Sequence, residues 1–198
     1  RLPRWGLTFS SSKLYHAHTV TGYVCGIDEA GRGALAGPLV AAAVMLHCDA
    51  ARIAKLAKTP IKDGKLLSLT QRKRIYNALR KCNTFFTTEI ISIRSINNRG
   101  IQRANREAIR RLIKRVEADR YIVDGRIRLG RINEKTYKIQ TKVDADATVP
   151  EVIFAGIVAK VERDKLMQEL DKEHPQYHWR INAGYGTRAH ISAILTHG

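Results

Sequence analysis

The stretch YVCGIDEAGRGALAGPLVAAAVML, residues 23–46, decides the fold prediction, because it holds two apolar runs separated by a glycine-bearing turn. Residues 23–27 form a short apolar strand pattern, and residues 39–46 are almost continuously apolar, as expected for a strand covered on both faces. The turn between them is Gly31-Arg32-Gly33. The pattern predicts a sheet with helices packed against both of its sides.

Two adjacent acids, Asp28 and Glu29, stand where the first apolar run meets the turn. Carboxylates at the edge of a sheet need a nearby cation, because burial of an unpaired charge is costly. Neighbouring strand residues point to opposite faces unless the backbone turns. Two interpretations therefore stay open at this point, a metal site and ordinary polarity at a strand end.

Further elements are predicted outward from this stretch. Residues 85–93 alternate in a strand-like manner, and residues 121–123 form a short apolar run. Residues 101–116 carry apolar side chains at three- and four-residue spacing, which predicts an amphipathic helix. A second helix is expected to begin at Thr148, with a Thr148–Glu151 capping box and Pro150 in its first turn, and to run to about residue 170.

Three later acids also stand at the ends of elements. Asp124 ends the third short run, and Asp144 and Asp146 precede the second predicted helix. Oxygen ligands brought together from separate elements are what Mg²⁺ and Mn²⁺ prefer, and two such ions roughly 4 Å apart can promote phosphodiester hydrolysis. From spacing alone, each acid can equally be a cap or a turn residue.

Composition limits the classes of protein to consider. The 198 residues are 44% hydrophobic, enough for one domain, and 35 Lys and Arg against 18 acids give a net charge of +17. Such a charge indicates a polyanionic partner, either nucleic acid or anionic lipid. A run of 18 apolar residues is absent, so no membrane span is expected. Three widely spaced cysteines predict free thiols in a reducing cytoplasm.

The order of several motifs resembles one known family. Residues 26–33, continued by residues 35–44, look like the opening signature of the type 2 ribonucleases H, the ribonuclease HII family. Matching blocks follow in order over roughly residues 22–198, and they are Asp63-x-Lys65-x-Leu67-Ser68, Val123-Asp124-Gly125, Asp146-x-x-Val149-Pro150-Glu151, Ala159-Lys160-Val161-x-Arg163-Asp164, Pro175-Gln176-Tyr177 and Gly184-Tyr185-Gly186-Thr187.

The resemblance implies an α/β ribonuclease H-like fold, with a mixed five-stranded sheet flanked by helices. It divides the chain into an N-terminal extension (1–20), a catalytic domain (21–170) and a small C-terminal helical segment (171–198). The implied activity is endonucleolytic hydrolysis of RNA in RNA/DNA hybrids, and cutting 5′ to ribonucleotides embedded in duplex DNA, leaving 5′-phosphate and 3′-hydroxyl ends. It further implies two Mn²⁺ or Mg²⁺ ions per site. A monomer is the default expectation, and the hydropathy pattern predicts no membrane partner.

The same resemblance assigns the site residues. Four carboxylates would be catalytic and would hold the metals, namely Asp28, Glu29, Asp124 and Asp146. Asp146 is preferred because the family's acid stands three residues before the Val of Val-Pro-Glu, and Asp144 is the alternative. Five residues would contact the substrate, namely Gly31, Arg32, Gly33, Lys65 and Tyr185. Taken alone, the turn would be ordinary, and Tyr185 would be a half-buried aromatic residue.

Several positions beside the substrate depart from the family pattern, and they are Gly64, Leu66, Gly100, Asn105, Gly156 and Ala183. In the family, most of these positions hold polar or charged side chains. These losses motivate a second hypothesis, a basic nucleic-acid-binding relative with weak or lost catalysis. The basic residues of the predicted helix at 101–116 are either a solvated face or contacts to a phosphate backbone, and they are Arg103, Arg106, Arg110, Arg111, Lys114 and Arg115.

Overall fold

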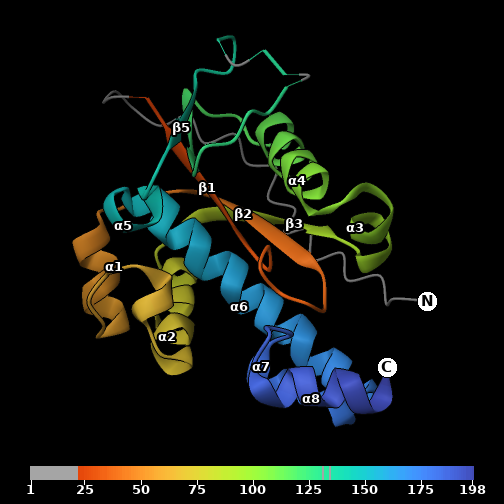
Figure 1. Ribbon diagram of the computed structural model, residues 1–198. Helices are drawn as coiled ribbons and strands as arrows, with labels where there is room; N and C mark the ends of the chain where they lie inside the picture. The colour runs from red at the N-terminus through yellow and green to blue at the C-terminus, as the bar shows by residue number, and fades with distance from the viewer. Residues whose placement is uncertain (1–21, 131, 134) are drawn as a thin grey trace.

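A five-stranded mixed sheet forms the centre of the protein (Figure 1). The structure, a computed structural model, describes residues 22–130, 132–133 and 135–198, so the predicted extension at 1–20 lies outside the described residues. The strand order is β3-β2-β1-β4-β5. Strand β1 pairs antiparallel with β2 and parallel with β4, which confirms the predicted mixed sheet. The strands are β1 (Val24–Ala30), β2 (Leu39–Met45), β3 (Phe85–Ile91), β4 (Arg120–Asp124) and β5 (Ile139–Lys142).

Helices fill most of the remaining described chain. They are α1 (Ala50–Ala57), α2 (Leu69–Lys81), α3 (Ile93–Arg99), α4 (Ile101–Arg115), α5 (Ala145–Thr148), α6 (Pro150–Glu173), α7 (Trp179–Asn182) and α8 (Arg188–His197), with 3₁₀ turns η1 (Gly64–Leu66) and η2 (Pro175–Tyr177). In the part of the chain that the structure describes, no helix is long and apolar enough to cross a membrane. Cys25, Cys48 and Cys82 are free thiols, as predicted.

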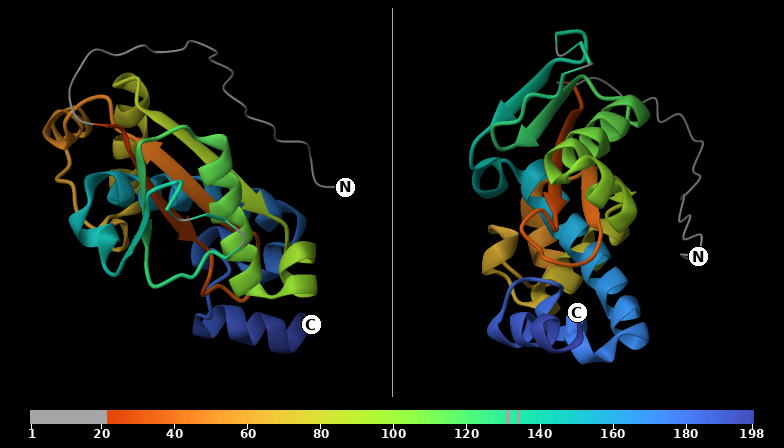
Figure 2. Two further views of the ribbon diagram at one scale, coloured as in Figure 1. Left: turned by 90° about the horizontal axis from the view of Figure 1, so that it is seen from above. Right: turned by 45° about the vertical axis from the view of Figure 1, so that its right-hand side comes forward.

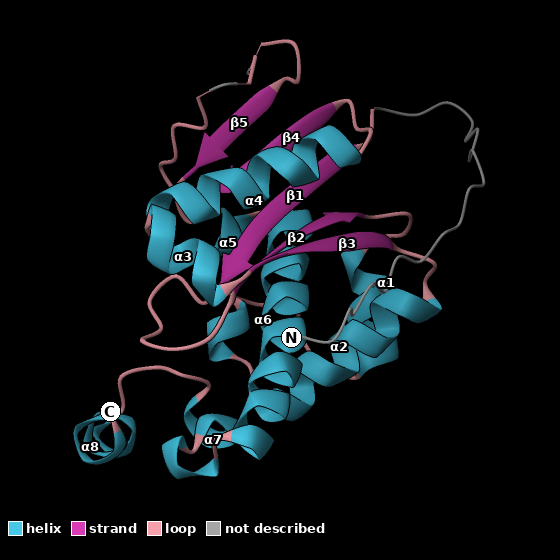
Figure 3. Cartoon of the chain, turned by 90° about the vertical axis from the view of Figure 1, so that its right-hand side faces the viewer, coloured by secondary structure: helices cyan, strands magenta, loops and turns pink. Residues whose placement is uncertain are grey.

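The two faces of the sheet are covered by different helices (Figure 3). Helix α4 packs on one face with Ile27 of β1 and Leu39 of β2, whereas α6, α1 and α2 pack on the other with Val40 and Val44. Strand β2 is buried over its first six residues, because alternate side chains enter opposite cores. This burial on both faces explains why residues 39–46 are almost continuously apolar.

The second predicted helix exists, but the expected capping box is wrong. Helix α6 begins at Pro150 with Val149 as its N-cap, and no side-chain cap hydrogen bond forms there. The Thr148 hydroxyl instead donates to the carbonyl oxygen of Asp144 at 3.1 Å, because residues 145–148 form the separate short helix α5. A capping box does form at Ser68 and Gln71, where it starts α2.

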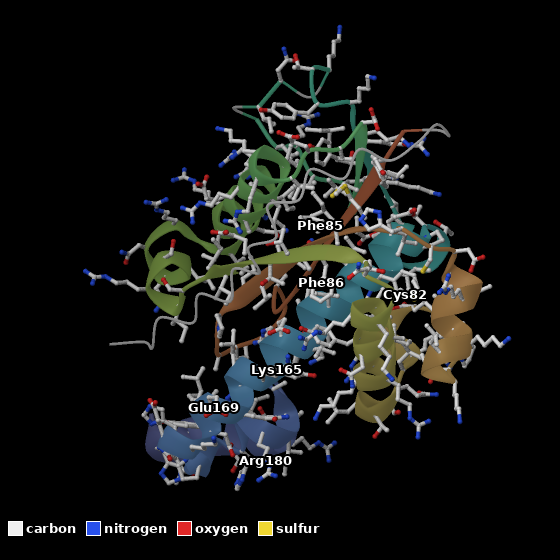
Figure 4. The ribbon with its side chains drawn as sticks, turned by 180° about the vertical axis from the view of Figure 1, so that it is seen from behind. Cys82, Phe85, Phe86, Lys165, Glu169 and Arg180 are labelled. Atoms are coloured by element: carbon white, nitrogen blue, oxygen red, sulfur yellow. The ribbon has the colours of Figure 1, made fainter. Side chains whose placement is uncertain are left out.

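The chain after α6 forms a helical cluster at one end of the molecule (Figure 2). The rings of Tyr177 and Trp179 stack there with centroids 5.0 Å apart. His190 is fully buried, and it accepts a hydrogen bond from the Trp179 indole nitrogen at 2.9 Å. At the back of the molecule, Phe86 of β3 lies near the end of α2 at Cys82 (Figure 4), and its ring packs 5.4 Å from that of Tyr76.

The basic face of α4 is partly engaged within the protein. Arg110 donates to the carbonyls of Leu129 and Gly130, and Arg111 and Arg115 both pair with Glu89. Among the described residues, the cations of this face outside such pairs are Arg103, Arg106 and Lys114. Half of the predicted basic face is therefore structural.

Candidate active site

The four predicted carboxylates border one cavity of about 480 Å³ at the edge of the sheet. This acid cluster consists of Asp28 and Glu29 from β1, Asp124 from the end of β4 and Asp146 from α5. Asp144 lies outside the cavity lining and is exposed, with a left-handed φ of 56°. The geometry therefore favours Asp146 over Asp144 as the fourth member of the cluster.

The strand geometry sends Asp28 and Glu29 to opposite sides of β1, as the sequence pattern predicted for adjacent strand residues. Asp28 faces α6, where its Oδ2 lies 2.4 Å from the position that a Cβ on Gly156 would occupy. Glu29 faces α4 and accepts a hydrogen bond from the side chain of Asn105. Both carboxylates nevertheless line the same cavity.

Sheet register and one hydrogen bond bring the remaining acids to the same place. Ile27 of β1 is the partner of Val123 of β4, so the residues that follow them, Asp28 and Asp124, lie at the same level of the sheet. The backbone N–H of Asp146 donates to Oδ1 of Asp124 at 3.2 Å. This hydrogen bond holds helix α5 against the end of β4.

The acid cluster is electrostatically strained by burial and mutual repulsion. Burial raises the pKa of Asp28 well above its usual range, and the charges of Glu29, Asp124 and Asp146 raise it further. Burial also raises the pKa values of Glu29 and Asp124. Clustered carboxylates of this kind gain from a cation that neutralises them.

Two cationic side chains of the protein meet the cluster. Lys65 Nζ lies 2.6 Å from Oδ2 of Asp146, and this hydrogen bond raises the pKa of Lys65. A guanidinium nitrogen of Arg32, Nη1, lies 3.1 Å from Oε1 of Glu29. Both cations are largely exposed, with 78% and 61% of their side chains accessible, so a bound polyanion can compete for them.

The donor set suits a divalent cation, although the carboxylates are not grouped around one point. In the described part of the chain, no set of three or more His, Cys, Asp or Glu side chains is arranged to hold a metal ion. Four carboxylates from three separate elements nevertheless line the same cavity, and oxygen ligands are those that Mg²⁺ and Mn²⁺ prefer.

One wall of the cavity carries the other predicted contacts. Gly31, Arg32, Gly33 and Tyr185 all line it. Gly31 has a φ of +105°, which explains the need for glycine there. Two cations approach the ring of Tyr185, with Lys160 Nζ 5.1 Å and the Arg163 guanidinium 5.3 Å from its centroid. Such contacts hold an aromatic ring in place.

The cavity has further lining residues to which the sequence assigned no role, and they are Ala30, Asp63, Gly64, Arg72, Ile153, Gly156 and Lys160. Asp63 accepts from the backbone N–H of Lys65 at 2.8 Å and thereby shapes the η1 turn that presents Lys65. Lys160 pairs with Asp164 at 2.6 Å. The motif blocks contained Asp63 and Lys160, but only the fold shows that they meet at the cavity.

The positions that depart from the family pattern have distinct surroundings. Gly64 packs against Ile157 of α6, and Leu66 is 67% exposed beside Lys65. Gly100 adopts a φ of +77° at the start of α4, with open space around it. Ala183 has a left-handed φ of 48°. Neither Leu66 nor Gly100 lines the cavity, and Leu66 places an exposed apolar side chain next to Lys65 in the sequence.

A mixed β3-β2-β1-β4-β5 sheet with carboxylates at the ends of β1 and β4 defines a nuclease of the ribonuclease H-like fold. The sequence matches the family described as Ribonuclease HII over residues 25–198. It is 38% identical over 188 residues to ribonuclease HII of Rickettsia prowazekii (strain Madrid E), covering 94% of this chain and 89% of that protein. It is 36% identical over 183 residues to ribonuclease HII of Wolbachia pipientis subsp. Culex pipiens (strain wPip), covering 91% and 88%.

A solved structure agrees with these sequence matches. The ribonuclease HII in the PCNA:RNase HII complex from Archaeoglobus fulgidus superposes with a TM-score of 0.74 at 28% identity, covering 88% of this chain and 87% of that chain. The chain belongs to the ribonuclease HII family. It is therefore a ribonuclease H, a metal-dependent endonuclease acting on RNA/DNA hybrids.

Proposed function

We propose that this ribonuclease cuts 5′ to ribonucleotides embedded in duplex DNA, as well as within longer hybrids, leaving 5′-phosphate and 3′-hydroxyl ends. The observation that carries the proposal is the placement of the acid cluster and the wall of Gly31, Gly33 and Tyr185 on one cavity. Hydrolysis needs the acid cluster, and recognition of a single ribose needs the glycine turn and Tyr185.

The acid cluster would hold two Mg²⁺ or Mn²⁺ ions. Bound there, the ions would supply an activated water and neutralise charge on the leaving oxygen. Asp28 and Asp124 would provide ligands from neighbouring strands, while Glu29 and Asp146 would close the site from the α4 and α5 sides. Burial, and secondarily the charges of neighbouring acids, raise the pKa values of Asp28, Glu29 and Asp124, and a bound cation would offset both costs of ionising these carboxyls, which supports this role.

The protein's other residues would hold the substrate strand. Lys65 would exchange its contact with Asp146 for a backbone phosphate, contributing affinity and salt dependence. The space beside Gly33 is open, since a Cβ added there would have no neighbour within 4 Å, and it would allow close approach to the ribose 2′-hydroxyl. Tyr185, backed by Lys160 and Arg163, would present the face of its ring to the sugar.

Cleavage of a duplex with one embedded ribonucleotide tests this proposal. We expect a single cut 5′ to the ribonucleotide with Mg²⁺ or Mn²⁺ at low salt, and none after the Asp124→Asn substitution. Cleavage of a long hybrid without cleavage of this duplex would contradict the proposed specificity. Binding without any turnover, unchanged by Asp124→Asn, would favour a relative with lost catalysis, for which the apolar, exposed Leu66 beside Lys65 is the supporting observation.

We further propose that the protein acts as a monomer in the cytoplasm. The three free cysteines support a reducing compartment. Sedimentation of the purified protein over a range of concentrations tests the monomer, and a mass of twice 22.3 kDa would contradict it.

A further inference from the structure

Arg163 of α6 is a fully buried cation that donates hydrogen bonds to three backbone carbonyls. Its guanidinium donates to Pro38 at 2.9 Å, to Ala36 at 2.9 Å and to Ala183 at 2.7 Å. Burial lowers its pKa. A buried charge persists in a fold only where its hydrogen bonds are well satisfied, so the three carbonyls must be held firmly in place.

These carbonyls belong to two segments that are far apart in the chain. Residues 31–38 follow β1, and residues 183–185 precede α8. The two segments also bond directly to one another, because the backbone N–H groups of Leu35 and Ala36 donate to the carbonyl of Gly184 at 2.8 and 3.2 Å. Together they form the loop pair, residues 31–38 and 183–185.

Glycines allow the loop pair to close around Arg163. A Cβ on Gly31 would lie 2.3 Å from Arg163 Nε, and one on Gly37 would lie 2.3 Å from the sulfur of Met167. A Cβ on Gly184 would lie 2.3 Å from the carbonyl oxygen of Ala36. All three glycines have positive φ, so both space and backbone conformation exclude side chains there.

We infer that Arg163 is a positioning residue for substrate specificity, which sets the distance between the Gly31–Gly33 turn and Tyr185. The inference rests on the proposed function, in which these two elements read a single ribonucleotide. Arg163 itself is 0% exposed and does not line the cavity, so it acts through the loop pair. The planar guanidinium reaches three carbonyls at once, a geometry that a lysine ammonium cannot reproduce.

The experiment compares two substrates of equal length, a uniform RNA/DNA hybrid and a DNA duplex with one embedded ribonucleotide. kcat and KM are measured for the wild type, Arg163→Lys and Arg163→Ala, and for Arg163→Ala with added guanidinium ion. Arg180→Lys is the matched control, because it is the same chemical change at an arginine that is exposed on α7 (Figure 4).

The ratio of kcat/KM for the embedded ribonucleotide to kcat/KM for the hybrid is the decisive readout. We expect Arg163→Lys and Arg163→Ala to lower this ratio roughly tenfold or more, mainly through KM, because polar contacts to the single ribose are misplaced. Guanidinium ion should restore part of the loss in Arg163→Ala. Arg180→Lys should leave both activities unchanged.

An equal loss on both substrates, without restoration by guanidinium, would assign Arg163 a merely structural role and overturn the inference. If neither Arg163 variant folds, Arg163→Gln decides, because it buries no charge and keeps a planar group that donates hydrogen bonds to the carbonyls. A lowered ratio in Arg163→Gln supports the inference, and an unchanged ratio overturns it. Failure of the wild type to cut the embedded ribonucleotide would instead refute the proposed function.

Discussion

The acid cluster and the loop pair both contribute residues to one cavity, yet they are held in place in opposite ways. The carboxylates stand at the ends of rigid elements and repel one another, so burial and like charge raise the pKa values of Asp28, Glu29 and Asp124. The loop pair has no regular secondary structure, and its positions depend on Arg163 and on glycines with positive φ. Regular secondary structure positions the carboxylates of the acid cluster, but their mutual repulsion is unfavourable. The backbone of the loop pair is instead held by contacts between residues that are distant in sequence.

The largest expected effect is that of a substitution in the acid cluster. Asp28→Asn should reduce cleavage roughly a thousandfold or more, as removal of a central catalytic group commonly does. The same change should raise the free energy of unfolding by on the order of 1 kcal/mol, because it removes one of several repelling buried charges. Cleavage assays and thermal unfolding of the same preparation measure both.

Asp144→Asn is the matched control for Asp28→Asn. Asp144 is exposed and outside the cavity lining, so its substitution should leave both activity and stability close to those of the wild type. A loss of activity in Asp144→Asn comparable to that in Asp28→Asn would show that Asp144 belongs to the acid cluster.

The dependence of stability on pH and on Mg²⁺ also tests the repulsion within the acid cluster. Because the folded pKa values of Asp28, Glu29 and Asp124 are raised, the folded state binds more protons than the unfolded chain above about pH 4. Without divalent ions, stability should therefore fall as pH rises from there through the raised pKa values. Mg²⁺ should raise the melting temperature more at about pH 8 than at about pH 5, where protons already neutralise part of the charge.

Thermal unfolding in EDTA and in Mg²⁺ at both pH values gives this result directly, and EDTA should also abolish cleavage. An Asp28→Asn variant should show a smaller response of the melting temperature to Mg²⁺. A response of equal size at both pH values would mean that carboxylate repulsion does not govern the stability of this region.

Gly156→Ala tests how closely helix α6 approaches the acid cluster. Alanine favours a helix over glycine by about 1 kcal/mol, but the added Cβ would lie 2.4 Å from Oδ2 of Asp28. We expect overpacking to prevail, with a net loss of about 1–2 kcal/mol of stability and impaired cleavage. Denaturant unfolding measures the sign, and a more stable variant would show that Asp28 has room to move.

Gly33→Ala serves as the stability control for this substitution. Nothing lies within 4 Å of a Cβ at Gly33, so its effect on the free energy of unfolding should stay within about 0.5 kcal/mol.

Apart from the control substitutions, the smallest expected effect on stability concerns the hydrogen bonds behind Tyr185. The Trp179 indole donates to Nε2 of His190, whose Nδ1 lies 2.9 Å from the Tyr185 carbonyl oxygen. Trp179→Phe keeps an aromatic ring against Tyr177 but removes the indole N–H, so it should cost about 1 kcal/mol of stability. Trp179→Ala, which also removes the stack, should cost more, and equal losses in both variants would assign the whole effect to the hydrogen bond.

Much of the fold was predictable because its signals are local. The apolar run at 39–46 and the spacing of residues 101–116 correspond to β2 and α4 within one residue at each end. Strand β5 was not located, since its four residues Ile139–Lys142 are mostly polar and lie at the sheet edge. The capping box was misplaced because Thr148 and Glu151 have the right spacing, whereas the chain bends between them.

The site was predictable in its acids and less so in its supports. Asp28, Glu29, Asp124 and Asp146 stand beside recognisable motifs, and the structure places all four at one cavity. Asn105 and Arg163 depend on contacts from other elements, and nothing in their own sequence neighbourhood signals burial. The family spacing already favoured Asp146 over Asp144, and the structure agrees, because Asp146 lines the cavity whereas Asp144 is exposed outside it.

The parallel register of β1 and β4 has a consequence for how this protein can evolve. Val123 points into the α4 core while the next residue, Asp124, borders the cavity. Deletion of one residue within 120–122 would move both side chains to the opposite face of the sheet, sending the acid into the apolar core against α4 and the valine to the place of Ile122 beside Ala145 and Val152. Strand β4 therefore tolerates replacement of residues far better than changes of length, and natural insertions should be confined to connections such as residues 125–130.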